Sequence, residues 1–169
     1  MNSTNLDGSG PMRVLHSEQF ILTSSVLQAG TLLSLRLISG QHLPNASDRQ
    51  AGEIIEPYVK INIHGHPVDT AAWVSSVVPK NGFNPLWDET AEFEIKYPEL
   101  ALVEFKVKSK AKVVGGQDAH LGSNMISLPL VRSGYRHVAL ETYEGTRLTP
   151  ASLFLRIHSH HRKTARTES

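Results

Sequence analysis

The sequence predicts an all-β sandwich, and three observations lead to that fold class. Short segments of alternating apolar and polar residues recur at roughly even spacing from residue 31 onward. No segment has the period of a convincing amphipathic helix, so packed sheets are the favoured architecture. Turn-forming residues separate the segments: Gly40, Pro44, Gly65, Pro67, Pro79, Gly82, Pro98, Gly115, Gly116, Pro129, Gly134, Gly145 and Pro150.

Eight strands are expected along the chain. The clearest of them carry an apolar residue at every second position, as a half-buried strand requires. The expected ranges are 31–38, 57–64, 73–78, 91–96, 102–108, 121–128, 135–140 and 152–157. The residues expected to point inward are Leu33, Leu35, Leu37, Val59, Ile61, Ile63, Phe93, Ile95, Val103, Phe105 and Val107.

Length and composition narrow the function classes. The chain has 169 residues, which suggests one domain with room for a full core. The net charge of +1 gives the chain no overall positive potential that would attract nucleic acid. The absence of cysteine excludes disulfides and thiolate metal sites. No apolar run approaches the ~18 residues of a membrane span, and residues 1–10 lack a basic signal-type segment. We therefore expect a cytoplasmic protein that is peripheral to a membrane.

Both ends of the chain differ in composition from its centre. Residues 1–30 form an N-terminal extension that we expect to be largely disordered, because residues 1–10 are rich in Asn, Ser, Thr and Gly. Residues 12–30 have apolar content without a clear period, and they either add a strand or lie loosely on the domain. The folded domain is expected over 31–158, followed by a basic, disordered tail over 159–169.

One turn is unusually rich in structure-forming residues. Gly82 permits a backbone turn that a side chain would resist, and Pro85 fixes the next bend. Phe83 and Trp87 give the turn enough apolar surface to dock on a sheet. We interpret it as a structural motif and not as a catalytic site; its residues are Asn81, Gly82, Phe83, Asn84, Pro85 and Trp87.

Several segments together resemble one known family. They are Ile38-Ser39-Gly40-Gln41-His42-Leu43-Pro44, Glu56-Pro57-Tyr58-Val59, the 81–87 turn, Pro98-Glu99-Leu100-Ala101-Leu102-Val103-Glu104-Phe105, Gly134-Tyr135-Arg136-His137-Val138 and Ala151-Ser152-Leu153-Phe154. The region 31–158 resembles the C2 domain of eukaryotic phosphoinositide-specific phospholipase C. The resemblance implies an eight-stranded antiparallel β-sandwich whose loops at one end can face a membrane.

The resemblance also implies a role in signal transduction. The family cleaves phosphatidylinositol 4,5-bisphosphate in a separate catalytic barrel, for which this chain has no room, so the chain alone is expected to be non-catalytic. We expect a membrane-association and scaffold module, as a fragment or splice form of the enzyme. The alternative is a stand-alone C2 protein that acts as a protein-interaction adaptor. The expected partners are an anionic membrane surface and either the catalytic barrel or another protein, but not nucleic acid.

Calcium-binding relatives carry loop acids that are largely missing here. Calcium needs six to eight oxygen ligands, and the acidic pair after the fifth strand is replaced by Ser109 and Ala111. The remaining acids form a weak site at best, so we expect no cofactor and no tightly bound metal. The vestigial calcium-loop positions are Asp48, Glu53, Glu56, Ser109, Ala111 and Asp118.

Four lysines stand where the acids are lost. Lys106, Lys108, Lys110 and Lys112 are spaced by two, which places them on one side of an extended segment. They form either a solvated strand face or a contact for anionic headgroups. At about 1 kcal/mol for each lysine near an anionic surface, the four contribute at most ~4 kcal/mol, which is roughly millimolar binding. Stable recruitment therefore requires a second attachment.

Other residue clusters fit no catalytic or metal chemistry. His158, His160 and His161 lie in the basic C-terminal segment without a cysteine or a suitably spaced acid to complete a zinc site. No Gly-x-Ser-x-Gly elbow supports a nucleophile. Trp73 and Trp87 are too few and too far apart for a nucleic-acid stacking platform.

Overall fold

The structure is a computed structural model that describes residues 30–45, 54–112 and 114–161. Its strands are β1 (Thr31–Gln41), β2 (Pro57–His64), β3 (Ala71–Val74), β4 (Leu86–Ile95), β5 (Leu102–Ser109), β6 (Ala119–Ser127), β7 (Gly134–Glu141) and β8 (Arg147–His161). Three short 3-10 helices, η2 (Pro67–Asp69), η3 (Pro98–Leu100) and η4 (Leu128–Leu130), lie between strands. Within the described ranges, no helix is long and apolar enough to cross a membrane.

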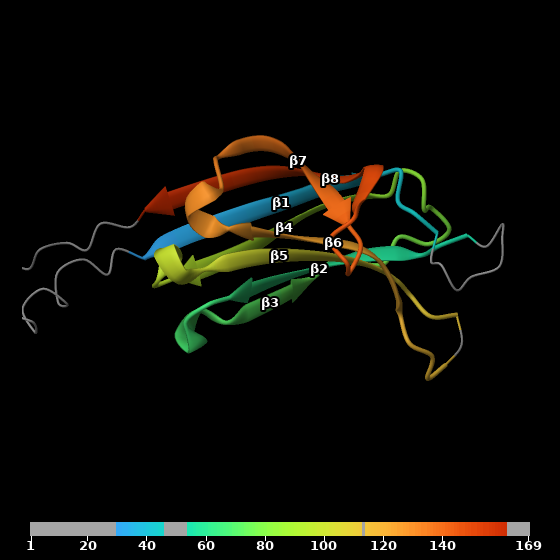
Figure 1. Ribbon diagram of the computed structural model, residues 1–169, viewed down its shortest axis with the longest axis horizontal. Helices are drawn as coiled ribbons and strands as arrows, with labels where there is room; N and C mark the ends of the chain where they lie inside the picture. The colour runs from blue at the N-terminus through green and yellow to red at the C-terminus, as the bar shows by residue number, and fades with distance from the viewer. Residues whose placement is uncertain (1–29, 46–53, 113, 162–169) are drawn as a thin grey trace, which may run out of the picture.

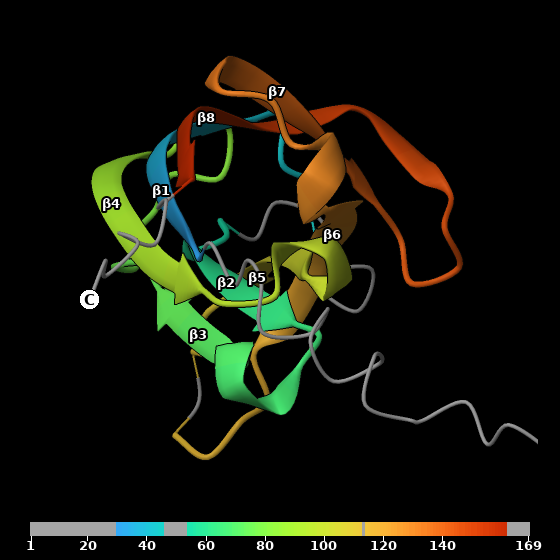
Figure 2. The ribbon, with the colours of Figure 1, turned by 90° about the vertical axis from the view of Figure 1, so that its left-hand side faces the viewer.

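The strands are ordered β3-β2-β5-β6-β7-β8-β1-β4, and neighbouring strands run antiparallel. β6 and β7 share a single register pair, Ser123 with Glu141, whereas the other neighbours share long ladders. The sheet therefore turns over at β6–β7 into two stacked layers, β3-β2-β5-β6 and β7-β8-β1-β4 (Figures 1 and 2). This confirms the expected all-β antiparallel sandwich.

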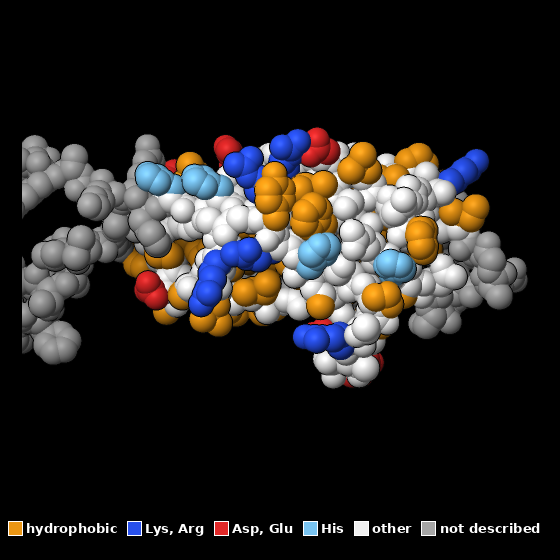
Figure 3. Space-filling model, turned by 90° about the horizontal axis from the view of Figure 1, so that it is seen from above, with side chains coloured by type: hydrophobic (Ala, Val, Ile, Leu, Met, Phe, Trp, Pro, Cys, Tyr) orange, Lys and Arg blue, Asp and Glu red, His pale blue; other side chains and the backbone are white. Residues whose placement is uncertain are grey.

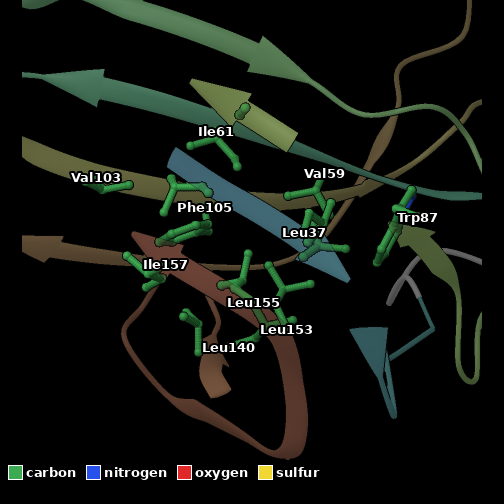
Figure 4. Packing of buried hydrophobic residues seen from close by; sticks show 14 of the residues in the cluster. Leu37, Val59, Ile61, Trp87, Val103, Phe105, Leu140, Leu153, Leu155 and Ile157 are labelled. Atoms are coloured by element: carbon green, nitrogen blue, oxygen red, sulfur yellow. The ribbon is translucent and has the colours of Figure 1, made fainter. Parts of the chain in front are cut away.

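The core lies between the two layers, and the strand periodicity locates it correctly. Every residue that the alternation places inward is buried, with Phe93 the most exposed of them at 6%. Figure 4 shows Val59, Ile61 and Phe105 of one layer facing Leu153 and Leu155 of the other. Burying apolar surface contributes roughly 25 cal/mol per Å², so this alternation is the main source of the fold's stability.

Several strand boundaries differ from the expected ones because pairing partners set them. The third strand was expected over 73–78 but runs over Ala71–Val74. Beyond it the chain still follows β2, with the amides of Ser75 and Val78 donating to carbonyls of that strand at 2.9 Å. The fourth strand begins at Leu86 instead of residue 91, since Leu86 pairs with Ser39 of β1.

The last strand corrects the expected end of the domain. β8 was expected over 152–157, but it runs from Arg147 to His161 and passes through Pro150, where a turn was expected. Pro150 is tolerated there because the register of β8 against β7 shifts just before Ser152. Residues 159–161 pair with β1 and are not part of a tail. The expected disorder of residues 1–29 and 162–169 lies outside the described residues.

The 81–87 turn is ordered, but only one of its two aromatic residues is buried. The side-chain amide of Asn81 donates to the Asn84 carbonyl and accepts from the Asn84 backbone N–H, both at 3.2 Å. A Cβ on Gly82 would clash with the side chain of Ile55. Trp87 is 8% exposed and donates its indole N–H to the carbonyl of Ser76 at 3.1 Å. The expectation that Phe83 also docks on the sheet is wrong, because its ring is 67% exposed.

Candidate functional site

Three loops meet at the end of the sandwich that lies on the right in Figure 1: 42–56 (described in part), 75–85 and 110–118. Backbone hydrogen bonds of 2.9 Å hold them together. Gly40 donates to the carbonyl of Pro85, His42 to that of Phe83, and Lys110 to that of Glu56. We call this end the rim.

Two of the expected calcium positions of the rim, Ser109 and Asp118, accept hydrogen bonds within the protein. The Ser109 hydroxyl accepts from the Glu56 amide at 3.0 Å. Asp118 accepts from the Tyr58 hydroxyl at 2.6 Å and from the Ala111 amide at 2.8 Å. Asp48 and Glu53 lie outside the described residues. In the described ranges, no group of three or more acids and histidines is placed to hold a metal ion.

Electrostatics at Asp118 follow from these contacts. The hydrogen bond from Tyr58, and then the one from the Ala111 amide, lower the pKa of Asp118. Burial, with the hydrogen bond to Asp118, raises the pKa of Tyr58 to about 12. Asp118 also lies 3.5 Å from the ammonium group of Lys110. The carboxylate therefore fastens the β5–β6 loop to β2.

The four predicted lysines do not share one extended segment. Lys106 and Lys108 lie on β5, but the strand ends at Ser109, and Lys110 and Lys112 belong to the following loop. The ammonium group of Lys106 lies 2.7 Å from Glu104, while Lys108 forms no ion pair with any residue that the structure describes. The structure thus brings two of the lysines together on a strand and places the other two along the rim.

A further cation joins the two strand lysines. Lys60 on β2 is the register partner of Lys106, and Tyr58 is the partner of Lys108. Because residues opposite each other in a ladder share a face, these side chains gather on the outer side of β2 and β5. We call this surface, with Lys60, Lys106 and Lys108, the lysine face. Sequence alternation places Lys60 outward but does not reveal its partner across the ladder.

Glu104 is a buried acid on the lysine face that sequence reasoning missed. It is 7% exposed, and its carboxylate accepts from Asn62 at 2.9 Å, contacts His64 at 2.8 Å and pairs with Lys106. Burial would raise the pKa of Glu104, but the hydrogen bonds from Lys106, His64 and Asn62 outweigh it and lower that pKa to about 2. The ion pair offsets the repulsion between the facing lysines.

Apolar side chains project from each of the three rim loops. Ile54 is 53% exposed, Phe83 is 67% exposed and Val114 is fully exposed. Exposed apolar groups beside a basic surface are typical of proteins that contact lipid interfaces. No periodic pattern marks these three residues, because they lie in loops, so the sequence does not single out Ile54 or Val114.

Comparisons with known proteins agree with this architecture. Residues 31–141 match the C2 domain family. The chain is 39% identical over 125 residues to Xenopus laevis 1-phosphatidylinositol 4,5-bisphosphate phosphodiesterase delta-4, covering 74% of this chain and 16% of that protein. It is 39% identical over 127 residues to human inactive phospholipase C-like protein 2, covering 75% and 11%. The chain thus spans about a sixth or less of the length of these relatives.

Two solved structures support the same fold. The crystal structure of L. pealei PLC21 superposes with a TM-score of 0.69 at 26% identity, covering 81% of this chain and 16% of that one. That of S. officinalis PLC21 gives a TM-score of 0.68 at 24% identity, over 82% of this chain and 17% of that one.

Proposed function

Because the chain belongs to the C2 domain family, we propose that it is a membrane-association module of the phospholipase C type that reaches anionic lipid without calcium. The observation that carries the proposal is that the rim loops joined to β2 and β5, the strands of the lysine face, expose Ile54 and Val114, while the third rim loop exposes Phe83. Lysines attract anionic headgroups, and exposed apolar side chains enter the interface, so both contribute to contact with one membrane.

The hydrogen bonds of the rim support independence from calcium. Asp118 is held by Tyr58 and Ala111, and the hydroxyl of Ser109 is used by Glu56. Calcium would have to break these contacts to recruit the oxygens, and it would still lack most of the six to eight ligands that it requires.

The expected affinity is modest. Lys60 and Lys108 each contribute about 1 kcal/mol near an anionic surface, and Lys106 contributes less because Glu104 neutralises it. Burial of Phe83 and the other exposed apolar side chains of the rim in lipid adds a contribution to the binding free energy that salt does not screen. Two weak attachments of different kinds fit reversible recruitment.

We further propose that this chain does not hydrolyse phosphoinositides by itself. In a longer protein the domain would hold a catalytic barrel at the membrane. The likeness to an inactive phospholipase C-like protein favours a second candidate, a non-catalytic adaptor that uses the same membrane contact.

Vesicle co-sedimentation tests the proposal. We expect binding to vesicles that contain phosphatidylserine or phosphatidylinositol 4,5-bisphosphate, weaker at high salt and equal in calcium and in a calcium chelator. The double variant Lys60→Gln and Lys108→Gln should lose most of the salt-sensitive part. The matched control, Lys96→Gln with Arg132→Gln, removes the same charge at the other end of the sandwich and should bind normally. Binding that requires calcium, or that ignores vesicle charge, would refute the proposal.

A further inference from the structure

A hollow of about 360 Å³ opens on the outer face of the other layer, over β4, β1 and β8. Its lining side chains come from two neighbouring rungs of the ladder: Thr90, Arg36 and Arg156 on one, Ser34 and His158 on the next. All five can donate hydrogen bonds, and no carboxylate lines the hollow.

The two arginines are held in place by neighbours. Arg36 donates to both carboxylate oxygens of Asp88, with Nε at 2.6 Å and Nη2 at 2.8 Å, which leaves its third nitrogen unused by that pair. The guanidinium of Arg156 stands over the ring of Tyr135, 5.9 Å from the centroid. A guanidinium fixed in this way loses less freedom when it binds an oxyanion.

The remaining lining groups are available for a ligand. Among the residues that the structure describes, the side chains of Ser34, Thr90 and His158 form no hydrogen bond with one another or with other side chains. Ser34 is partly exposed, and Thr90 and His158 are exposed. Two guanidinium groups, two hydroxyl groups and an imidazole thus face one open space.

An aromatic strip adjoins the hollow. Tyr135 stacks on Phe154 with ring centroids 5.7 Å apart, and Phe154 stacks on His137 at 4.7 Å. Tyr135 is 58% exposed. Figure 3 looks onto β7 and β8 and shows hydrophobic side chains beside those of Lys or Arg and His on this side of the molecule. A ligand larger than an ion can therefore rest an apolar group on the strip while its anion enters the hollow.

We propose that this hollow binds a phosphate monoester carried on a side chain of a partner protein, with the neighbouring side chain of that partner on the Tyr135–Phe154 strip. A phosphate dianion offers three acceptor oxygens, enough for both guanidinium groups and the hydroxyls. A carboxylate fits less well, because it offers two acceptor oxygens and a single negative charge. Asp88, which holds Arg36, and Glu92, the register partner of Ser34, lower the affinity of the hollow for either anion.

The orientation of the two layers decides the source of the phosphate. Outer faces of stacked layers point away from each other, so a molecule that meets a membrane through its lysine face and rim holds the hollow on the opposite side of the sandwich from the lysine face (Figure 2). The choice of a protein over a lipid headgroup therefore rests on the proposed function, whereas the phosphate site itself does not.

The test titrates the isotopically labelled full chain with a short peptide in which phenylalanines flank one phosphoserine. We expect backbone amides of residues 34–36 and 156–158 to shift in NMR spectra. The same peptide with plain serine should bind about tenfold more weakly, because the charge-assisted hydrogen bonds are lost. A phosphoserine peptide flanked by glycines should fall between the two.

Variants locate the site. Arg156→Gln should weaken binding of the phosphopeptide about tenfold, whereas Arg147→Gln, the same change elsewhere on β8, should not. Arg156 is exposed, so its variant should fold, and His158→Gln provides a second, smaller loss. Equal affinity for the phosphorylated and plain peptides, or amide shifts confined to β2 and β5, would overturn the site.

A competition experiment with lipid vesicles distinguishes a phosphate on a protein from a phosphate on a lipid headgroup. Vesicles that contain phosphatidylinositol 4,5-bisphosphate should bind without displacing the phosphopeptide. Displacement would show that the hollow takes a lipid headgroup and would overturn the protein source. The Lys60→Gln and Lys108→Gln variant should lose most of its salt-sensitive vesicle binding yet keep its affinity for the phosphopeptide, so failure of the proposed function and failure of this inference give different results.

Discussion

The two aromatic residues of the 81–87 turn lie four positions apart and meet opposite environments. Trp87 is buried with its N–H satisfied by Ser76, whereas Phe83 is mostly exposed at the rim. The turn therefore has an inner side that builds the domain and an outer side that is open to a partner. Large aromatic residues of one turn can therefore have different roles. A residue on the buried side stabilises the fold, and a residue on the exposed side is available for binding.

The largest expected effect is on the inner side. Trp87→Ala should lower the free energy of unfolding by about 3–5 kcal/mol, because it leaves a cavity and an unpaired carbonyl. Urea unfolding followed by circular dichroism measures this change. A loss below about 1 kcal/mol would mean that Trp87 does not anchor the turn.

An intermediate effect on stability tests whether a buried ion pair contributes more to the free energy of unfolding than an exposed one. Glu104→Gln should cost about 2–3 kcal/mol at pH 7, since the pKa of Glu104 lies at about 2 in the folded protein against an ordinary 4.5. Because the folded-state pKa is the lower one, this stabilisation is present above about pH 4.5 and is lost as pH falls toward 2.

The measurement is the difference in unfolding free energy between wild type and Glu104→Gln across that pH range. Asp88→Asn is the control, because the Arg36–Asp88 pair is exposed and its loss should change stability little. A difference that stays constant between pH 5 and pH 2 would contradict the assignment.

The smallest effect on stability belongs to the outer side of the turn. Phe83→Ser should change the free energy of unfolding by less than about 0.5 kcal/mol, as exposed substitutions usually do. It should nevertheless reduce vesicle binding, mainly the part that remains at high salt. If the Phe83→Ser variant unfolds at a urea concentration well below the wild-type midpoint, Phe83 stabilises the fold as Trp87 does, and the two sides of the turn do not differ.

The sequence predicts the core of this fold better than its edges. Alternation along β1, β2 and β5 depends only on local spacing, so the inward residues could be identified from it. The limits of β3 and β8 depend on partners far along the chain, such as Thr31 opposite His161, which no local pattern contains. The sequence also cannot separate Phe83 from Trp87, because both are large aromatics in the same turn.

The candidate site was predictable in its residue types but not in its pairings. The lysines were visible as a spacing of two, yet the end of β5 at Ser109 and the burial of Glu104 depend on residues of β2. Asp118 is bound by Tyr58, sixty positions away. The hollow has no sequence signal, since its five lining residues come from three separate strands.

Thr31 and His161 stand opposite each other in the ladder, at the end of the sandwich that lies farthest from the three loops (Figure 1). Anything fused before one or after the other is thus attached at the same corner, behind the surface proposed to meet lipid. Since the chain has no cysteine, a single thiol placed there gives one dye or surface tether per molecule and holds the domain with its rim pointing outward.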